Sequence, residues 1–295
     1  MTLFTPRLWF LPFLFVFASL IPLPVQAGLE PAEVSAFEGY KKAAQKGDAT
    51  AQRELGKCYY KGLGVTKDAV EAVKWYRKSA DQGDAKGQFN LGVCYDNGLG
   101  VAKDDVEAVK WYQKAADQGV AQAQGNLGFS YAHGEGVAKD DVEAVKWYRK
   151  AAEQGDAMAQ RELGVCYFNG LGVVKDDVEG VKWSQKAAEQ GDATAQGNLG
   201  SCYANGLGVA KDDVEAVKWY QKAADQGGAK GQIKLGFCYY NGLGVVRDAV
   251  EAVKWYQKAA DQGDAKAQGY LGWHYAHGLG VAKDDVEAVK WYQKA

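Results

Sequence analysis

The 295-residue sequence has no proline after Pro31, although five prolines occur up to that point. It has only three histidines and two methionines, and its 35 basic and 37 acidic side chains nearly cancel, which gives a net charge of −2 at pH 7. A chain balanced in this way lacks the basic patch that attracts nucleic acid or an anionic membrane. Without proline, the loops of the remaining chain must be built by glycine, of which there are 37.

Sequence motifs of common catalytic sites are absent as well. No Ser-x-x-Lys, Gly-x-Ser-x-Gly or His-Glu-x-x-His occurs, and there is no phosphate-binding loop. Gly-x-Gly pairs such as Gly62 and Gly64 do occur, but each follows a predicted helix and not a strand, so the dinucleotide-binding fingerprint fails in its context. Acidic side chains recur in register as helix caps and solvated faces. The sequence predicts no catalytic residue, no cofactor and no metal site.

The one long hydrophobic run lies at the N-terminus. Arg7 is the only charge before an apolar run over residues 8–21, and a short segment then ends in small residues at Val25 and Ala27. This layout is typical of a secretory signal peptide. At about 14 residues, and with Pro12 inside it, the run is short for a membrane-spanning helix, which needs roughly 20. We expect cleavage after Ala27 and a periplasmic or secreted product; an uncleaved membrane anchor is the alternative.

Most of the chain is a single sequence unit repeated in tandem. From Gly47 onward a 36-residue unit is written seven times without an insertion or deletion, and Leu55, Gly56 and Tyr59 have counterparts at the same offsets in every copy. A period of 20 to 50 residues is typical of stacked units that bury their apolar faces only against their neighbours. The function of such a solenoid is expected in a surface and not in a pocket. The copies span residues 47–82, 83–118, 119–154, 155–190, 191–226, 227–262 and 263–295.

Each unit is predicted to form two helices separated by a glycine loop. In the first copy, Asp48 is placed to cap a helix over residues 49–61. Asp68 and Glu71 form an Asp-x-x-Glu capping box for a second helix over residues 69–82. No alternation typical of strands lies between them. The sequence therefore predicts an all-α chain.

Two glycine columns have specific predicted roles. Gly83 follows the second helix, where a left-handed residue is wanted to end it. Gly56 lies in the middle of the first helix, where glycine costs about 1 kcal/mol relative to alanine. Its presence in all seven copies predicts that the second helix approaches closely, through the side that carries Ala72 and Trp75.

These repeated positions resemble the Sel-1-like repeat (SLR) family, a relative of the tetratricopeptide repeats with a longer loop between its helices. The resemblance covers residues 47–295 and implies a right-handed α-solenoid of antiparallel helix pairs. Residues 28–46 resemble a solitary second helix and are predicted to cap the first repeat. The positions that carry the resemblance are Ala51, Gln52, Leu55, Gly56, Tyr59, Gly62, Gly64, Val65, Asp68, Ala72, Trp75, Tyr76, Lys78, Ala80, Gln82 and Gly83.

The five cysteines all occupy one column of the repeat. Because equivalent positions of neighbouring repeats lie about 8–10 Å apart and a disulfide needs Cα atoms within about 7 Å, we expect buried free thiols. The family resemblance supplies an alternative, since some cysteine-rich members with two cysteines per repeat, joined by a disulfide, have been assigned penicillin-binding or β-lactamase activity. This chain has one cysteine per repeat. The column reads Cys58, Cys94, Ser130, Cys166, Cys202, Cys238 and His274.

His274 and His277 are the strongest candidates for metal ligands. They stand three residues apart on one predicted helix, so they share a face. Only two ligands are visible, however, and His277 belongs to a column that otherwise holds Asn, Lys and His133. We interpret this pair as capping or surface-lining residues.

Sequence differences between the copies concentrate in the first helix. The second helix hardly changes, while the variable columns begin with Thr50, Arg53, Glu54, Lys57, Tyr60 and Lys61. The resemblance to tetratricopeptide repeats implies that the first helices line the concave surface, where a ligand would bind. Drift after a recent duplication is the alternative explanation of this variation.

Two of these columns form the predicted partner-binding site. One is mainly apolar and one is rich in amides, which suits an extended peptide that needs side-chain pockets and backbone hydrogen bonds. Helix capping is the alternative role for the asparagines, and carbohydrate binding is an alternative for the aromatic residues. The predicted function is an exported, non-enzymatic scaffold for a protein or peptide partner. The candidate residues are Val93, Phe129, Val165, Phe237 and Trp273 with Asn97, His133, Asn169, Asn205, Asn241 and His277.

Overall fold

The computed structural model describes residues 30–295, which form 15 α-helices and no strand in that part of the chain. The predicted signal peptide, residues 1–27, lies outside the described residues. The helices are α1 (Pro31–Gln45), α2 (Ala49–Lys61), α3 (Ala69–Asp81), α4 (Ala85–Asn97), α5 (Asp105–Asp117), α6 (Ala121–His133), α7 (Asp141–Glu153), α8 (Ala157–Asn169), α9 (Asp177–Glu189), α10 (Ala193–Asn205), α11 (Asp213–Asp225), α12 (Ala229–Asn241), α13 (Ala249–Asp261), α14 (Ala265–His277) and α15 (Asp285–Lys294).

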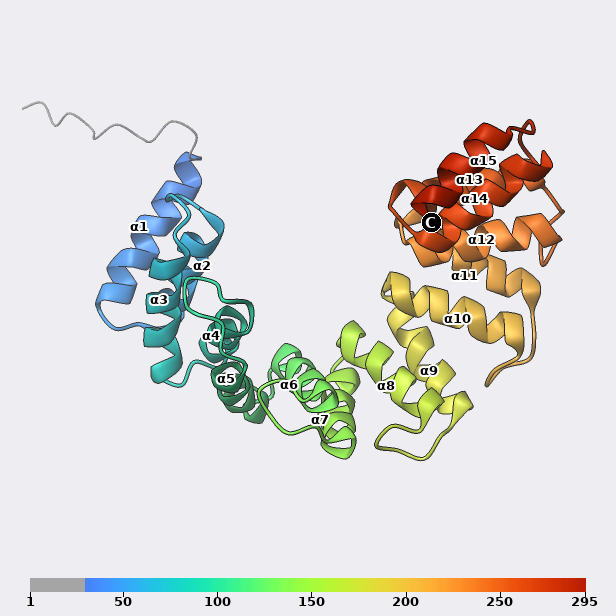
Figure 1. Ribbon diagram of the computed structural model, residues 1–295. Helices are drawn as coiled ribbons and strands as arrows, with labels where there is room; N and C mark the ends of the chain where they lie inside the picture. Colours follow the sequence, from blue (N-terminus) through green and yellow to red (C-terminus); the bar gives the residue numbers. More distant parts are fainter. Residues whose placement is uncertain (1–29) are drawn as a thin grey trace, which may run out of the picture.

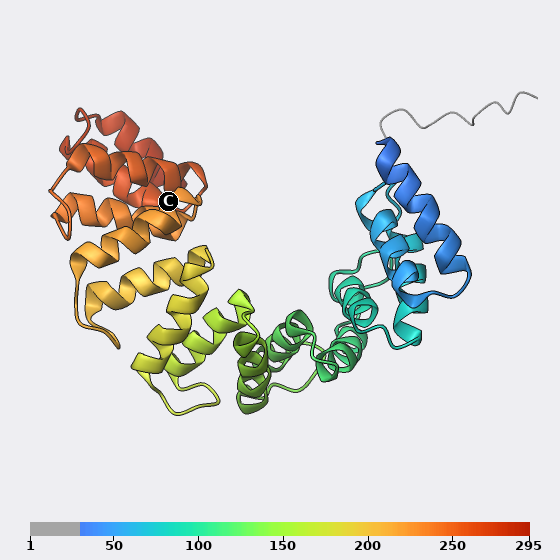
Figure 2. The same ribbon diagram turned by 180° about the vertical axis from the view of Figure 1, so that it is seen from behind.

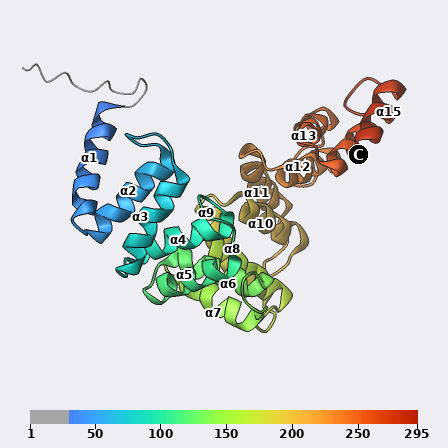
Figure 3. The same ribbon diagram turned by 60° about the vertical axis from the view of Figure 1, so that its left-hand side comes forward.

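The even-numbered helices α2 to α14 are the first helices of the repeats, and the odd-numbered helices α3 to α15 are the second. The predicted all-α solenoid is confirmed: the helix pairs stack along a curved path, with α1 at one end and α15 at the other (Figures 1 and 2). A third view shows that the path also winds out of a single plane (Figure 3). First helices of neighbouring repeats contact each other, as in α2 with α4 and α6 with α8.

Helix capping follows the sequence prediction in part. Asp48 caps α2 by accepting a hydrogen bond from the Ala51 amide, and Asp68 caps α3 by accepting one from the Glu71 amide. The reciprocal half of the predicted capping box is not formed. The Asp68 amide donates to the carbonyl of Tyr59 at 2.8 Å, and the Glu71 carboxylate instead pairs with Lys74 at 2.8 Å. The chain therefore ties the start of α3 to the end of α2, which fixes the loop between them.

The glycine in the middle of each first helix marks the contact between the two helices of a repeat. A Cβ atom at Gly56 would lie 2.7 Å from Cδ1 of Tyr76 and 3.1 Å from the carbonyl oxygen of Ala72. The predicted close approach is thus present and involves Ala72, but the ring that fills it belongs to Tyr76 and not to Trp75. Gly83 has a φ of +87°, the left-handed conformation expected after α3.

The hydrophobic core is a continuous row of small clusters shared between consecutive helix pairs. The leucine of each first helix is fully buried, as Leu55 and Leu127 illustrate, and Phe37 of α1 packs over Leu55 and Cys58 at the N-terminal end. The tyrosines of the Tyr76 column are buried beside this row, with Tyr112 only 1 % exposed, except Tyr292 of the last repeat, which is 47 % exposed. Stability is therefore distributed along the solenoid, because each repeat completes the core of the next.

Candidate partner-binding surface

The first helices lie on the inner side of the curve. In Figure 1 the chain bends so that its two ends rise on the same side of the molecule, and α6 lies toward that open side relative to α7. This arrangement agrees with the contacts between successive first helices, because the inner helices of a curved stack are the ones that crowd together. We call the surface that the variable columns form on these helices the inner face; the columns begin with Thr50, Arg53, Glu54, Lys57, Tyr60 and Lys61.

Buried glutamines link each repeat to the next beneath the inner face. Gln88 Nε2 donates to the Ala80 carbonyl at 3.3 Å, across the boundary between the first two repeats, and its Oε1 accepts from Gln118 at 2.8 Å. The same pattern recurs in other copies, as in Gln124 with Gln154 at 2.7 Å. Because buried amides are costly when unpaired, these bonds help to fix each first helix, such as α4, against the second helices before and after it.

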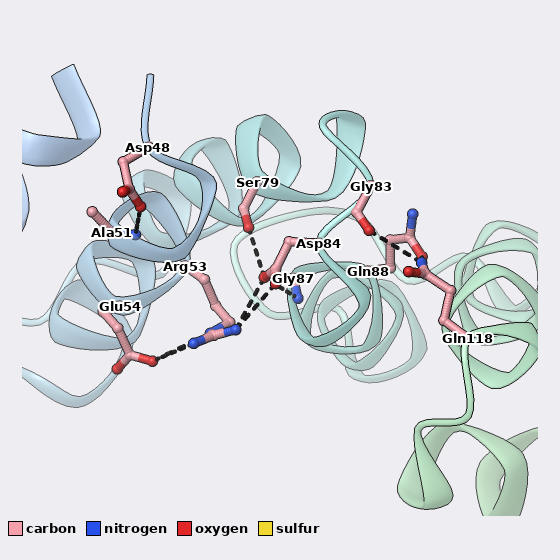
Figure 4. A network of polar contacts seen from close by, with 10 residues as sticks. All are labelled: Asp48, Ala51, Arg53, Glu54, Ser79, Gly83, Asp84, Gly87, Gln88 and Gln118. Atoms are coloured by element: carbon pink, nitrogen blue, oxygen red, sulfur yellow. Dashed lines mark hydrogen bonds and ion pairs between the residues drawn. The ribbon is translucent and has the colours of Figure 1, made fainter. Parts of the chain in front are cut away.

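A second link joins the first two repeats through charged side chains (Figure 4). Arg53 Nη1 lies 3.1 Å from Oδ1 of Asp84, the residue that caps α4, and Arg53 also pairs with Glu54 at 2.9 Å. Asp84 accepts a further hydrogen bond from the Ser79 hydroxyl at 2.9 Å. The fourth repeat reproduces the arginine contact, with Arg161 Nη1 2.8 Å from Asp192. These charged side chains are therefore paired with one another within the solenoid.

The predicted apolar column is on the surface. Phe129 and Phe237 are 38 % and 44 % exposed, and Trp273 is partly buried. Val93 and Val165 are partly buried as well. The structure thus places these five side chains on the inner face in the second, third, fourth, sixth and seventh repeats, and none of them is in the buried core.

The predicted polar column also lies on the surface, but its side chains contribute to the ends of their own helices. Four asparagines of this column (Asn97, Asn169, Asn205 and Asn241) each donate from Nδ2 to the carbonyl four residues earlier, at 2.7–3.0 Å. His133 and His277 make the equivalent contact through Nδ1 and stack on Phe129 and Trp273, with ring centroids 4.0 and 4.5 Å apart. Each asparagine therefore commits one amide hydrogen to helix capping.

The C-terminal part of the inner face is hollowed. One depression, of about 680 Å³, is lined mainly by rings, and we call it the aromatic hollow. An adjoining depression of about 910 Å³, the lysine hollow, lies between the N-terminal halves of α10 and α12 and the start of α14. The two share Lys266. The rings of the aromatic hollow are Phe237, Tyr240, Tyr256, Tyr270, Trp273 and Tyr292.

Several of these lining residues were not among the predicted site residues. Tyr240 belongs to the Tyr60 column, Lys234 and Tyr270 to the Glu54 column, and Lys230 and Lys266 to the Thr50 column. All of those columns vary between the copies, so the sequence variation could have identified these residues. It could not have predicted the hollows, because their shape depends on how neighbouring helices pack.

The cysteine column forms part of the helix seam. All five cysteines are free and buried, as expected, and burial raises the pKa of the Cys94, Cys166, Cys202 and Cys238 thiols to about 11. A thiol with so high a pKa is a poor nucleophile at neutral pH. These residues act as small apolar side chains.

His274 takes the place of cysteine in the seventh repeat and is only 2 % exposed. Its Nδ1 lies 2.7 Å from the Leu279 carbonyl, and burial lowers its pKa. His277 is exposed and contacts the Trp273 carbonyl, as described above. Over residues 30–295 no group of three potential ligands gathers around either histidine. The two side chains have separate structural roles.

Repeat four departs from the others at the helix–helix contact. Ser184 stands where other copies have tyrosine, and Gly180 stands where they have alanine. The ring of Phe168 closes over the gap, so that a Cβ atom at Gly180 would lie 2.6 Å from it. The Phe168 ring of α8 thus occupies space beside the smaller residues of α9.

These features define an α-solenoid built from helix-pair repeats. The chain belongs to the Sel1 repeat family, whose model matches residues 49–84, 85–120, 121–156, 157–192, 193–228, 229–264 and 265–295. Such repeats are commonly protein-binding scaffolds. No helix among residues 30–295 has the length and apolar character needed to cross a membrane.

Two solved structures are similar to this chain over most of its length. One is c5321, a protective antigen of uropathogenic Escherichia coli strains that displays an SLR fold, with 43% identity and a TM-score of 0.80 over 88% of this chain and 55% of that one. The other is a Sel1 repeat protein from Oxalobacter formigenes, with 38% identity and a TM-score of 0.75 over 82% of this chain and 96% of that one. The chain spans about half the length of c5321. A search of curated proteins gave no match.

Proposed function

We propose that the chain is an exported, non-enzymatic scaffold that binds a protein or peptide partner along its inner face. The observation that carries this proposal is the row of large apolar side chains there, in particular Phe129 and Phe237, which remain 38 % and 44 % exposed. Exposed aromatic residues that gather on one surface usually mark an interaction site. They are also common binding hot spots, worth roughly 2 kcal/mol or more each.

The geometry of the polar column supports an extended peptide as the bound segment. Because each capping asparagine uses one amide hydrogen within its helix, its carbonyl oxygen and second hydrogen remain suited to pair with a peptide backbone. Asn169, Asn205 and Asn241 repeat at equal intervals along the chain, one for each repeat. A peptide that runs along the solenoid would meet such a group at every repeat.

The test is affinity capture of partners from the native compartment. Replacing Phe129, Phe237 and Trp273 together by alanine should abolish capture, because three anchors of the complex are lost. The helical content measured by circular dichroism should not change, since none of the three is a core residue. A matched control replaces Val142, Val178 and Val250, which are 54 %, 51 % and 52 % exposed on second helices, by alanine. Unchanged capture by the first variant would refute the proposal.

Export is proposed from the N-terminal sequence alone. If residues 1–27 are a cleaved signal, as their composition indicates, the mature protein begins at Gly28. N-terminal sequencing of the protein recovered from its producing cells checks this directly. A start at Met1, in a fraction that sediments with membranes, would support an anchor instead.

The state of the cysteines bears on the alternative that the chain is a β-lactamase. The resemblance tied that activity to members with two disulfide-bonded cysteines per repeat, whereas Cys58 and its four counterparts are free. We expect no nitrocefin turnover by the purified chain, and five reactive thiols per molecule once denaturant is added. Nitrocefin turnover that co-purifies with the chain would contradict its assignment as a non-enzymatic scaffold.

A further inference from the structure

We propose that the C-terminal part of the inner face binds an acidic peptide segment that carries a large aromatic or aliphatic side chain. This inference rests on the proposed function and specifies its partner. It combines the aromatic hollow with the charge of the lysine hollow beside it. The shared residue Lys266 places a positive charge at the boundary between the two, so a single short segment can reach both.

The charge of the lysine hollow is not balanced within the chain. Lys230, Lys234 and Lys266 are exposed around it, and none of them forms an ion pair within residues 30–295. The only carboxylate that lines this hollow is Asp264, which caps α14 by accepting a hydrogen bond from the Ala267 amide at 3.0 Å. Three unpaired lysines around a single carboxylate that already caps a helix favour an anionic ligand.

One substitution in the repeat adds to this imbalance. In five of the seven copies the residue before the first helix is aspartate, but before α12 it is Gly228, which lines the lysine hollow. Gly228 has φ −65° and ψ 112°, close to the −63° and 112° of Asp84. The backbone is therefore the same and a negative charge is missing from the hollow.

The N-terminal end of the inner face is different. There Arg53 pairs with Glu54 and with Asp84, and Lys57 lies 3.7 Å from Glu54. Arg53 and Lys57 are thus neutralised by the chain itself, although Lys86, the counterpart of Lys230 in the second repeat, is exposed and forms no ion pair among the described residues. We place the acidic part of the ligand over α12 and α14 because three unpaired lysines gather there beside the aromatic hollow.

The arrangement of rings favours a side chain over a sugar as the occupant of the aromatic hollow. Sugars stack on open, flat ring faces, but one face of Trp273 is stacked on His277, and Tyr240 meets Trp273 at 87° with ring centroids 5.6 Å apart. Tyr270 is likewise stacked on Tyr256, at 5.0 Å. Rings that meet edge to face enclose a space suited to an aromatic or branched side chain.

The experiment is a selection from a random dodecapeptide library with the purified chain as bait, followed by titration of the enriched peptides. Enriched sequences should combine Asp or Glu with an aromatic or large aliphatic residue. Replacing the three lysines by alanine should weaken binding of these peptides about tenfold or more at low salt, and added salt should weaken binding to the native chain in the same direction. Trp273→Ala should remove the preference for the large apolar residue.

Gly228→Asp is the matched variant, because it restores the cap found in other repeats and should not destabilise α12, yet it should weaken binding of acidic peptides.

Enrichment of neutral or basic peptides, no enrichment, or peptide binding that is unchanged by the lysine replacement would overturn the inference. Binding of polygalacturonate that depends on the same lysines and on Trp273, without peptide binding, would assign the surface to an acidic polysaccharide. If partner capture is lost in the Phe129, Phe237 and Trp273 variant while selected peptides are not acidic, the scaffold function stands and only the acidic preference fails.

Discussion

The second helices neutralise their lysines locally, whereas the first helices of the last repeats do not. In all seven second helices a lysine pairs with the glutamate three residues earlier at 2.5–2.9 Å, as in Lys74 with Glu71. A second lysine in each lies 3.7–4.0 Å from the centroid of the repeat tryptophan, as in Lys78 over Trp75. Lys230, by contrast, has no ion-pair partner among the described residues.

This difference separates the residues that build the solenoid from those that give it a recognition surface. A side chain whose partner lies on the same helix pair has the same surroundings in every copy, so its column stays uniform. A side chain on the inner face lies at the surface, where its contacts with its own helix do not require one residue type, so its column can differ from copy to copy at little cost in stability. Variation among the copies is thus permitted by the structure at the positions where specificity is proposed.

The largest expected effect is a loss of stability when a core side chain is replaced, with little loss when a side chain of the inner face is replaced. Tyr112 is 1 % exposed and packs on Gly92, whereas Phe129 is 38 % exposed. Tyr112→Ala should lower the free energy of unfolding by about 3–5 kcal/mol, because a large cavity is left. Phe129→Ala should lower it by no more than about 0.5–1 kcal/mol. Urea denaturation followed by circular dichroism measures both, and similar losses would show that the inner face is part of the core.

Two glycines of α10 allow the core side and the exposed side of one helix to be compared. A Cβ atom at Gly200 would lie 2.7 Å from the Tyr220 ring, while a Cβ atom at Gly197 would meet nothing within 4 Å. Gly200→Ala should therefore destabilise the chain by about 1–3 kcal/mol through overpacking. Gly197→Ala should stabilise it by about 0.5–1 kcal/mol, since alanine is the better helix former. Thermal unfolding of the two variants should shift in opposite directions; a shift in the same direction would contradict the assigned contact.

The sequence was sufficient for the repeat, the helix pairs and the burial of the cysteine column, because each depends on spacing that recurs seven times. It did not distinguish Trp75 from Tyr76 at the glycine contact, since both lie on the same broad apolar side of α3 and only the rotation of the helix decides between them. The predicted capping box failed in its second half because the loop offers the Tyr59 carbonyl to the Asp68 amide. Such competition between local and tertiary partners is not visible in a motif.

The candidate surface was predictable to a lesser degree. The columns of Phe129 and Asn97 were found because they vary or repeat in register, and the structure places the Asn97 column on exposed positions and the Phe129 column on exposed or partly buried ones. The hollows were not found, since their shape depends on how α12 and α14 pack. The aromatic hollow exists because Tyr240, Tyr270 and Trp273, from two different helices and three different columns, converge on the same space.

The smallest expected effect concerns the one histidine in the cysteine column. Burial lowers the pKa of His274, so the unfolded chain binds its proton more readily than the folded chain does. The stability that this neutral side chain contributes is present above its unfolded pKa of about 6.5 and is lost as the pH falls through that value toward the folded pKa. His274→Cys, which restores the residue of five other copies, should therefore reduce the drop in Tm between pH 7 and pH 5 by a small amount. An unchanged pH dependence in the His274 variant would mean that this side chain does not titrate differently in the folded and unfolded states.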